Sequence, residues 1–238
     1  MRRIELIKKK YNLLDDKQIK IAIIDSGIRS DYKTDNIKLQ VKDYINNNTK
    51  ECMHGTTILD IIFNFLPNAY YYIYKVINNN RKGNSNNCIK ALIDAINKEC
   101  NVINFSIAIV NDKVKEIISK ITDYCKNNNI FLVCSGIKET SYPYSLKNSI
   151  KVVDNLFLLE MDNIDTQPDF VVNTPYVNLF YRKDQRADVN FTSTSFATAF
   201  ISGLIGLVLI NFPYFSYDQI IEKAKEINEN INQILNQY

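Results

Sequence analysis

Residues 19–27 read Ile-Lys-Ile-Ala-Ile-Ile-Asp-Ser-Gly, an apolar and mostly β-branched run that ends at an acid, a serine and a glycine. The four consecutive apolar residues at 21–24 would make both faces of a strand apolar. Strands of this kind are typical of parallel sheets that carry helices on both sides. The stretch therefore predicts a buried parallel strand with Asp25 at its carboxyl end.

The rest of the chain alternates between strand-like and helix-like segments. Further strands are expected at 38–45, 70–77, 101–107, 130–134 and 150–154. Apolar residues spaced by three and four predict one-sided helices at 57–65, 87–99 and 113–126, and an amphipathic helix after a capping box at 216–219. This alternation predicts an α/β fold with a mostly parallel sheet between helical layers.

Composition is that of an ordinary globular protein. The 238 residues are 46% hydrophobic and 23% charged, which is enough for one sizeable core, so we expect a single domain over 1–238 with a helical extension at 1–18. Because 29 basic residues nearly balance 26 acidic ones, the net charge is only +3. This small net charge argues against nucleic acid or a membrane surface as the partner.

Cysteine usage and the N-terminus predict a cytoplasmic location. The five cysteines are scattered and never form Cys-x-x-Cys, which argues against a disulfide framework or a zinc site. The N-terminus is basic without an apolar run, so neither a signal peptide nor a propeptide is expected. Residues 196–212 are the only candidate membrane span, but they are short and contain Thr198 and Ser202, so a buried helix is the better interpretation.

Three polar residues are expected at the carboxyl edge of the sheet, where ligands of α/β proteins gather. Asp25 follows a strand, His54 is the only histidine and begins a helix, and Ser195 lies in the first turn of an apolar helix. Each has an ordinary alternative, as a turn cap, a structural histidine or a helix cap. Together they supply the acid, the base and the hydroxyl of nucleophilic catalysis.

In this order and with these flanks, the segments resemble the catalytic blocks of the subtilisin-like serine peptidases, the subtilases. Residues 25–27 are similar to the D-S/T-G block, 54–56 to H-G-T, and 194–197 to G-T-S-M-A. The stretch 102–106 resembles V-I-N-M-S, and Tyr142-Pro143 resembles a dipeptide that is cis in relatives. The resemblance extends over residues 19–228, almost the whole chain.

The resemblance implies a subtilisin-like three-layer fold with about seven strands and a catalytic triad of Asp25, His54 and Ser195. A substrate peptide would bind as an added strand along Ser106, Ile107 and Ala108. The loop after Val76, with Gly83 and Asn84, would form the other wall of the binding site. Ser135, Gly136 and Lys138 would line the pocket for the residue before the scissile bond. No cofactor or metal is expected, and Asp162, Asp165 and Asp169 are interpreted as surface acids.

One departure affects the oxyanion site. Where the family has A-A-G-N, this chain has Cys134-Ser135-Gly136-Ile137, and isoleucine cannot donate a hydrogen bond. Loss of one such donor costs about 100- to 1,000-fold in turnover. The Ser195 backbone N–H remains, and Thr194 is a candidate auxiliary donor. Ser193 also replaces the glycine of G-T-S.

Two functions are consistent with these residues. The first is a cytoplasmic serine endopeptidase with narrow specificity, such as removal of the leader from a precursor peptide. The second is a pseudopeptidase that binds peptides or a partner protein with little turnover, for which Ile137 is the argument. The sequence identifies no particular substrate and no partner subunit.

The Lys138 ammonium group generates a prediction about specificity. We expect a preference for an acidic or polar residue before the scissile bond, because Lys138 follows the position of the missing asparagine. Hydrolysis of matched peptides with Asp or Lys at that position measures the preference. The Lys138→Glu change is expected to reverse it, and a preference that stays the same would contradict the assignment.

Overall fold

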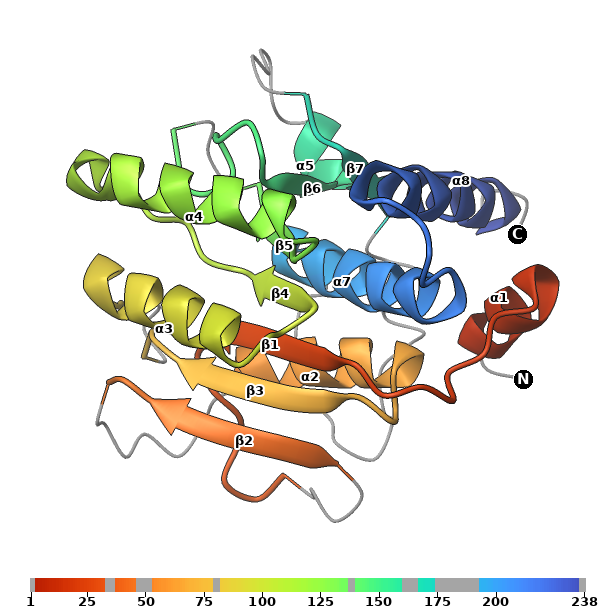
Figure 1. The fold of residues 1–238 in the computed structure, drawn as a ribbon, viewed down its shortest axis with the longest axis horizontal. Helices are drawn as coiled ribbons and strands as arrows, with labels where there is room; N and C mark the ends of the chain where they lie inside the picture. The colour runs from red at the N-terminus through yellow and green to blue at the C-terminus, as the bar shows by residue number, and fades with distance from the viewer. Residues whose placement is uncertain are drawn as a thin grey trace.

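The structure is a computed structural model that describes residues 3–32, 37–45, 53–78, 82–136, 140–159, 167–173 and 193–235. Seven strands form one sheet in the order β2-β3-β1-β4-β5-β6-β7, and every neighbouring pair is parallel. The strands are β1 (Lys20–Asp25), β2 (Lys38–Asp43), β3 (Tyr70–Lys75), β4 (Val102–Phe105), β5 (Phe131–Ser135), β6 (Ile150–Asp154) and β7 (Phe170–Val172). Figure 1 shows that their carboxyl ends face one side of the molecule.

Helices cover both faces of the sheet (Figure 1). The helical elements are α1 (Arg3–Tyr11), α2 (Met53–Phe65), α3 (Ser85–Asn97), the short 3-10 helix η1 (Asp112–Val114), α4 (Lys115–Asn127), α5 (Asn155–Leu159), α7 (Thr194–Asn211) and α8 (Tyr217–Leu235). Helices α1, α2, α7 and α8 contribute to one hydrophobic cluster, and α3 and α4 contribute to a second on the opposite face. The fold is therefore three-layered.

Strand β1 lies inside this sheet with both faces buried, as the sequence predicted. Ile21 and Ile23 belong to the cluster under α2 and α7, and Ala22 and Ile24 belong to the cluster under α3 and α4. All four have no exposed surface. The expected strands from β1 to β6 are present with small shifts at their ends, while β7 was not predicted individually.

Helix α7 lies beside α2 on the same face of the sheet, where it packs against β4, β5 and β6. By length and apolar composition it could cross a membrane, but 89% of its residues are buried inside the protein, as in a core helix. An added Cβ at Gly203 would lie 2.6 Å from the Phe65 ring, so the glycine allows α2 and α7 to pack closely. The Phe65 and Phe200 rings meet edge to face at 5.1 Å.

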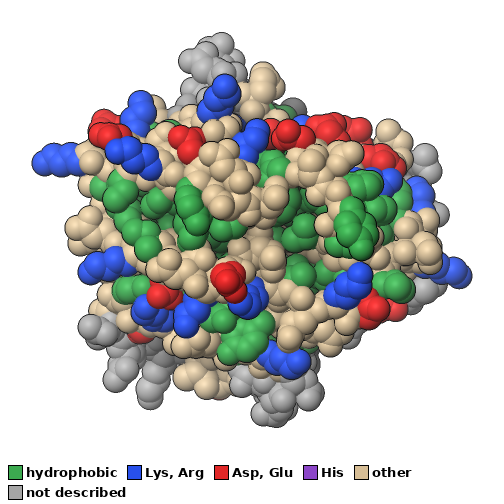
Figure 2. Space-filling model, viewed as in Figure 1, with side chains coloured by type: hydrophobic (Ala, Val, Ile, Leu, Met, Phe, Trp, Pro, Cys, Tyr) green, Lys and Arg blue, Asp and Glu red, His purple; other side chains and the backbone are tan. Residues whose placement is uncertain are grey.

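Charges of both signs are interspersed on the surface. On the face that carries α3 and α4, lysines and arginines alternate with acids and with patches of apolar side chains (Figure 2). This distribution agrees with the small net charge of +3. At the edge away from the strands' carboxyl ends, α1 packs near α8, where the Lys223 ammonium lies 5.9 Å from the Tyr11 ring.

Candidate active site

The structure brings two of the expected residues into direct contact. Asp25 is the last residue of β1 and is completely buried, and His54 is the second residue of α2. The His54 Nδ1 atom lies 2.9 Å from Asp25 Oδ1 and 3.0 Å from Oδ2. A carboxylate in this position accepts the Nδ1 proton, which leaves Nε2 as the basic nitrogen of the neutral ring. The His54 side chain is 24% exposed, so the imidazole can be reached from outside.

Two glycines allow α2 to begin beside the end of β1. Gly27 has a φ of +83°, in the region that favours glycine. An added Cβ at Gly55 would lie only 2.0 Å from the Gly27 carbonyl oxygen. The backbone of Gly55 also donates to Ser26 Oγ at 3.1 Å, and that of Arg29 donates to Thr56 Oγ1 at 2.9 Å. The segments 25–27 and 54–56 are thus one packed unit that orients the imidazole.

Ser195 lies in the first turn of α7, next to this unit. The Phe196 ring stacks on the His54 ring with 5.6 Å between centroids, so the start of α7 packs against the imidazole. Ser195 is 6% exposed. Its backbone N–H donates to the side chain of Ser193, the N-cap residue of α7, at 3.2 Å. Thr194 is buried, and its carbonyl accepts a hydrogen bond from the Thr198 hydroxyl at 2.8 Å.

A buried asparagine that the sequence analysis gave no role connects β4 to α7. Asn104 is completely buried, donates from Nδ2 to Ser106 Oγ at 3.0 Å and accepts from Ser202 Oγ at 3.0 Å. The Ser106 hydroxyl lies 3.5 Å from the Ser195 carbonyl oxygen, at the outer limit of a hydrogen bond. The sequence contains a clue to this role, because Asn104 is a single amide within an apolar strand and a buried amide needs hydrogen-bond partners.

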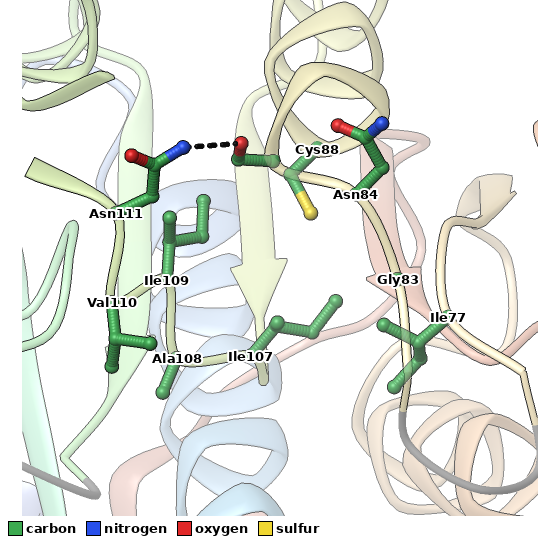
Figure 3. Close-up of a pocket in the computed structure, with 10 residues that line it drawn as sticks. Ile77, Gly83, Asn84, Cys88, Ile107, Ala108, Ile109, Val110 and Asn111 are labelled. Carbon is green, nitrogen blue, oxygen red and sulfur yellow. Dashed lines mark hydrogen bonds between the residues drawn. The ribbon is translucent and has the colours of Figure 1, made fainter. Parts of the chain in front are cut away.

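A groove of about 440 Å³ lies beyond the carboxyl end of β4 (Figure 3). Residues 107–111 form one wall, and the other consists of Ile77, residues 83–85 and Cys88. The amide of Asn111 donates to Ser85 Oγ at 3.1 Å and ties the two walls together. The groove thus contains Ile107, Ala108, Gly83 and Asn84, which the sequence analysis had assigned to its two sides. Ser106 is buried beneath it, in the Asn104 network.

The backbone of this wall is only partly paired. Ile109 and Tyr142 exchange two hydrogen bonds, at 3.1 and 2.8 Å. Within the described part of the chain, the backbone N–H and C=O groups of Ile107 and Ala108 make no hydrogen bond. This short edge can therefore accept an added peptide strand.

The structure describes only part of the pocket that was expected at the end of β5. The Ser135 hydroxyl is buried and, among the described residues, has no hydrogen-bond partner. An added Cβ at Gly136 would lie 2.5 Å from the Tyr144 ring, which therefore packs directly on this glycine. The peptide bond between Tyr142 and Pro143 is cis. Ile137 and Lys138 lie outside the described residues, as do Asp162 and Asp165.

Two other ionisable side chains, Cys88 in the groove and Asp169 at the amino end of β6, have environments that fit a structural role. Burial raises the pKa of the Cys88 thiol to about 12, so this groove residue stays protonated near neutral pH and is a poor nucleophile. Asp169 Oδ2 accepts the Lys151 backbone N–H at 2.8 Å. Within the described ranges, no three His, Cys, Asp or Glu side chains gather into a metal-binding cluster.

Comparison with known proteins relates the chain to solved structures. No protein-family model and no curated sequence matches it. A structure described as a lanthipeptide protease is similar with a TM-score of 0.69 at 17% identity, over 93% of this chain and 84% of that one. The protease domain of PatA, solved as a serine-to-alanine mutant, gives 0.62 at 18% identity, over 82% of this chain and 80% of that one. The prenylagaramide maturation protease PagA gives 0.62 at 20% identity, over 90% and 82%.

At these identities the likeness concerns the fold. The seven-stranded, all-parallel sheet of this chain, with its flanking helices, matches the fold of these structures. The predicted subtilisin-like, three-layer α/β fold is therefore confirmed.

The contact between Gly55 and Gly27 leads to a stability prediction. We expect Gly55→Ala to lower the free energy of unfolding by about 1–3 kcal/mol, because the new methyl group would meet a backbone oxygen that cannot move aside. Gly206→Ala is the matched control, since its methyl would meet the flexible ends of Leu66 and Ile19 and alanine favours the helix. Urea unfolding measures both variants. A Gly55→Ala cost no larger than that of Gly206→Ala would contradict the proposed close approach.

Proposed function

We propose that the protein is a serine endopeptidase that cleaves peptide bonds through an acyl-enzyme on Ser195. The observation that carries the proposal is the buried Asp25 carboxylate bonded to the sole imidazole, His54, with the first turn of α7 packed on the same ring. An acid, a base and a hydroxyl at one edge of a sheet are the groups that nucleophilic acyl transfer requires. Support also comes from the shared fold of three structures that are described as proteases.

In the first half of the reaction, His54 acts as the base. Its Nε2 takes the proton of Ser195 as Oγ forms a bond to the substrate carbonyl carbon, and the π electrons of the carbonyl move to its oxygen. Asp25 keeps the Nδ1 proton in place and stabilises the positive charge that develops on the ring. The burial of Asp25 strengthens this interaction, because water does not screen it.

In the second half, the proton is returned. The tetrahedral intermediate collapses, the carbon–nitrogen bond breaks, and Nε2 gives its proton to the leaving amine. A water molecule then attacks the ester on Ser195, with His54 again as the base, and releases the second product. Asp25, His54 and Ser195 thus carry the chemistry, with no cofactor required by these steps.

The substrate is a peptide or protein that binds as an added strand. The Ile107 and Ala108 backbone groups form the receiving edge, and the adjoining groove accepts a side chain of the substrate. Its walls carry Ile77, Ile107, Ile109 and Val110, so an apolar side chain fits best. Ser135, Gly136 and Lys138 are proposed to receive the residue before the scissile bond.

A narrow role in precursor processing fits these features best. Two of the similar structures are described as a lanthipeptide protease and a prenylagaramide maturation protease. A groove with tied walls selects among peptides more strongly than an open surface does. We therefore propose leader removal from a precursor peptide in the cytoplasm. The buried free thiols of Cys88, Cys100, Cys125 and Cys134 suit that reducing compartment.

A second candidate is a pseudopeptidase that binds peptides or a partner protein with little turnover. One specific observation favours it: the Ser195 backbone N–H, which an oxyanion would need, already donates to Ser193. Ile137 removes the other donor that the family would supply. In that case the groove would retain its binding role without efficient catalysis.

Labelling with a fluorophosphonate probe separates the two candidates. We expect the parent chain to react covalently and Ser195→Ala not to react, because the probe needs an activated serine. His54→Ala is expected to slow labelling by at least about 100-fold through loss of the general base. Cys88→Ser serves as a control, since its protonated thiol takes no part. Equal failure of the parent chain and Ser195→Ala to react would favour the pseudopeptidase.

The groove generates a prediction about peptide substrates. We expect Val110→Asp to lower kcat/KM about 10- to 200-fold for peptides with an apolar residue in the groove, because a carboxylate would oppose its burial. The small probe does not reach the groove, so its rate is expected to stay the same. Val110 is 68% exposed, so folding should tolerate the change. Leu14→Asp, at a similarly exposed site outside the groove, is the control. If Val110→Asp and Leu14→Asp lower kcat/KM equally, the groove does not bind the substrate side chain.

A further inference from the structure

The hydroxyl of Ser193 accepts the backbone N–H of Ser195, a donor that an oxyanion formed at Ser195 would also need. The Ser195 backbone N–H donates to Ser193 Oγ at 3.2 Å. An oxyanion stabilised by the same N–H would lie about 2.7–3.1 Å from that nitrogen. The two oxygens would therefore compete for one donor, and a substrate oxygen that takes the N–H comes within hydrogen-bonding reach of the displaced hydroxyl.

A serine hydroxyl has chemical capacity beyond this contact. It accepts through its lone pairs and also carries one proton that it can donate, and the hydroxyl rotates to suit its partners. Ser193 is the N-cap of α7, with an extended backbone at φ −153° and ψ 126°. Its side chain thus stands outside the helical turn, at the positive end of the helix dipole, where a developing negative charge is stabilised.

We propose that the Ser193 hydroxyl is the second oxyanion donor of this protein, in place of the amide that Ile137 lacks. The proposal rests on the acyl-transfer function proposed above. As the Ser195 Oγ–carbon bond forms, the carbonyl π electrons move to oxygen, and this oxygen takes the Ser195 N–H. The Ser193 hydroxyl then turns its O–H towards the same oxygen. Its proton stays on Ser193, and the bond to Ser195 reforms when the carbonyl is restored.

The structure favours Ser193 over Thr194 for this role. It is the Ser193 side chain that bonds to the Ser195 N–H, the backbone donor proposed for the oxyanion. Thr194 is the first residue of the helix, so its side chain is not the cap that holds this N–H. The exchange is favourable only when the substrate oxygen is negatively charged, because charge-assisted hydrogen bonds are stronger than the neutral cap that they replace. The interaction therefore acts mainly in the transition state, as a rate-enhancing contact must.

Substitution of Ser193 tests the donor without unfolding the helix. Glycine is nearly as good an N-cap as serine, so Ser193→Gly should fold like the parent chain. Ser193→Ala removes the hydroxyl in a second way, and Ser193→Thr keeps a hydroxyl at the cap. The matched control is Ser216→Gly, because Ser216 Oγ accepts the Gln219 backbone N–H at 3.3 Å at the start of α8.

The experiment measures kcat and KM on a cleaved peptide, together with the rate of fluorophosphonate labelling and the thermal unfolding midpoint. For Ser193→Gly and Ser193→Ala we expect kcat to fall about 100- to 1,000-fold with little change in KM. Ser193→Thr should recover most of the lost rate, and Ser216→Gly should match the parent chain.

Each alternative outcome has a definite meaning. If the parent chain is active and Ser193→Gly is equally fast or faster, the hydroxyl only covers the Ser195 N–H, and this proposal is overturned while the peptidase function stands. If Ser193→Thr is as slow as Ser193→Ala, the hydroxyl is not the donor. If the parent chain reacts no better than Ser195→Ala, the peptidase function fails and this inference fails with it.

Discussion

The close approach of two backbones, at Gly27 and Gly55, is the constraint on which the carboxylate–imidazole pair depends. Strand β1 fixes Asp25 because it is buried on both faces and paired on both sides. The ring of His54 reaches that carboxylate only if α2 begins directly over the end of the strand. A side chain at Gly55 would meet the Gly27 carbonyl and separate the two elements, and one at Gly27 would be strained by the positive φ there. The polar contact is thus a consequence of how closely uncharged backbone atoms can pack.

Helix α7 combines an apolar body with a polar start. Its apolar residues bury against α2 and the sheet, and this burial sets the position of the first turn. The hydroxyls within the helix do not oppose burial, because Ser202 bonds to Asn104 and Thr198 bonds to the Thr194 carbonyl. Asn104 in turn holds Ser106 at the end of β4. The core therefore connects the start of α7 with the edge proposed to bind the substrate.

Much of this arrangement could be predicted from the sequence, where periodicity or a strong local pattern carried the information. The double-sided apolar run of β1 and the buried helix α7 are examples, whereas the two walls of the groove were expected from the family resemblance. Strand β7 has only three residues, too few for a period to be recognised. The partners of Asn104 and the acceptor of the Ser195 N–H depend on side-chain directions across elements, which spacing along the chain does not encode. The position of Ile137 was recognised by resemblance and lies outside the described residues.

The partly exposed ring of His54 is also the sole imidazole of the chain. In a proton magnetic resonance spectrum its carbon-bound ring protons produce one pair of signals that needs no assignment by mutagenesis. A molecule that binds next to His54 and moves the stacked Phe196 ring would perturb that pair through the ring current. The protein thus contains a single-residue magnetic resonance reporter within its candidate site.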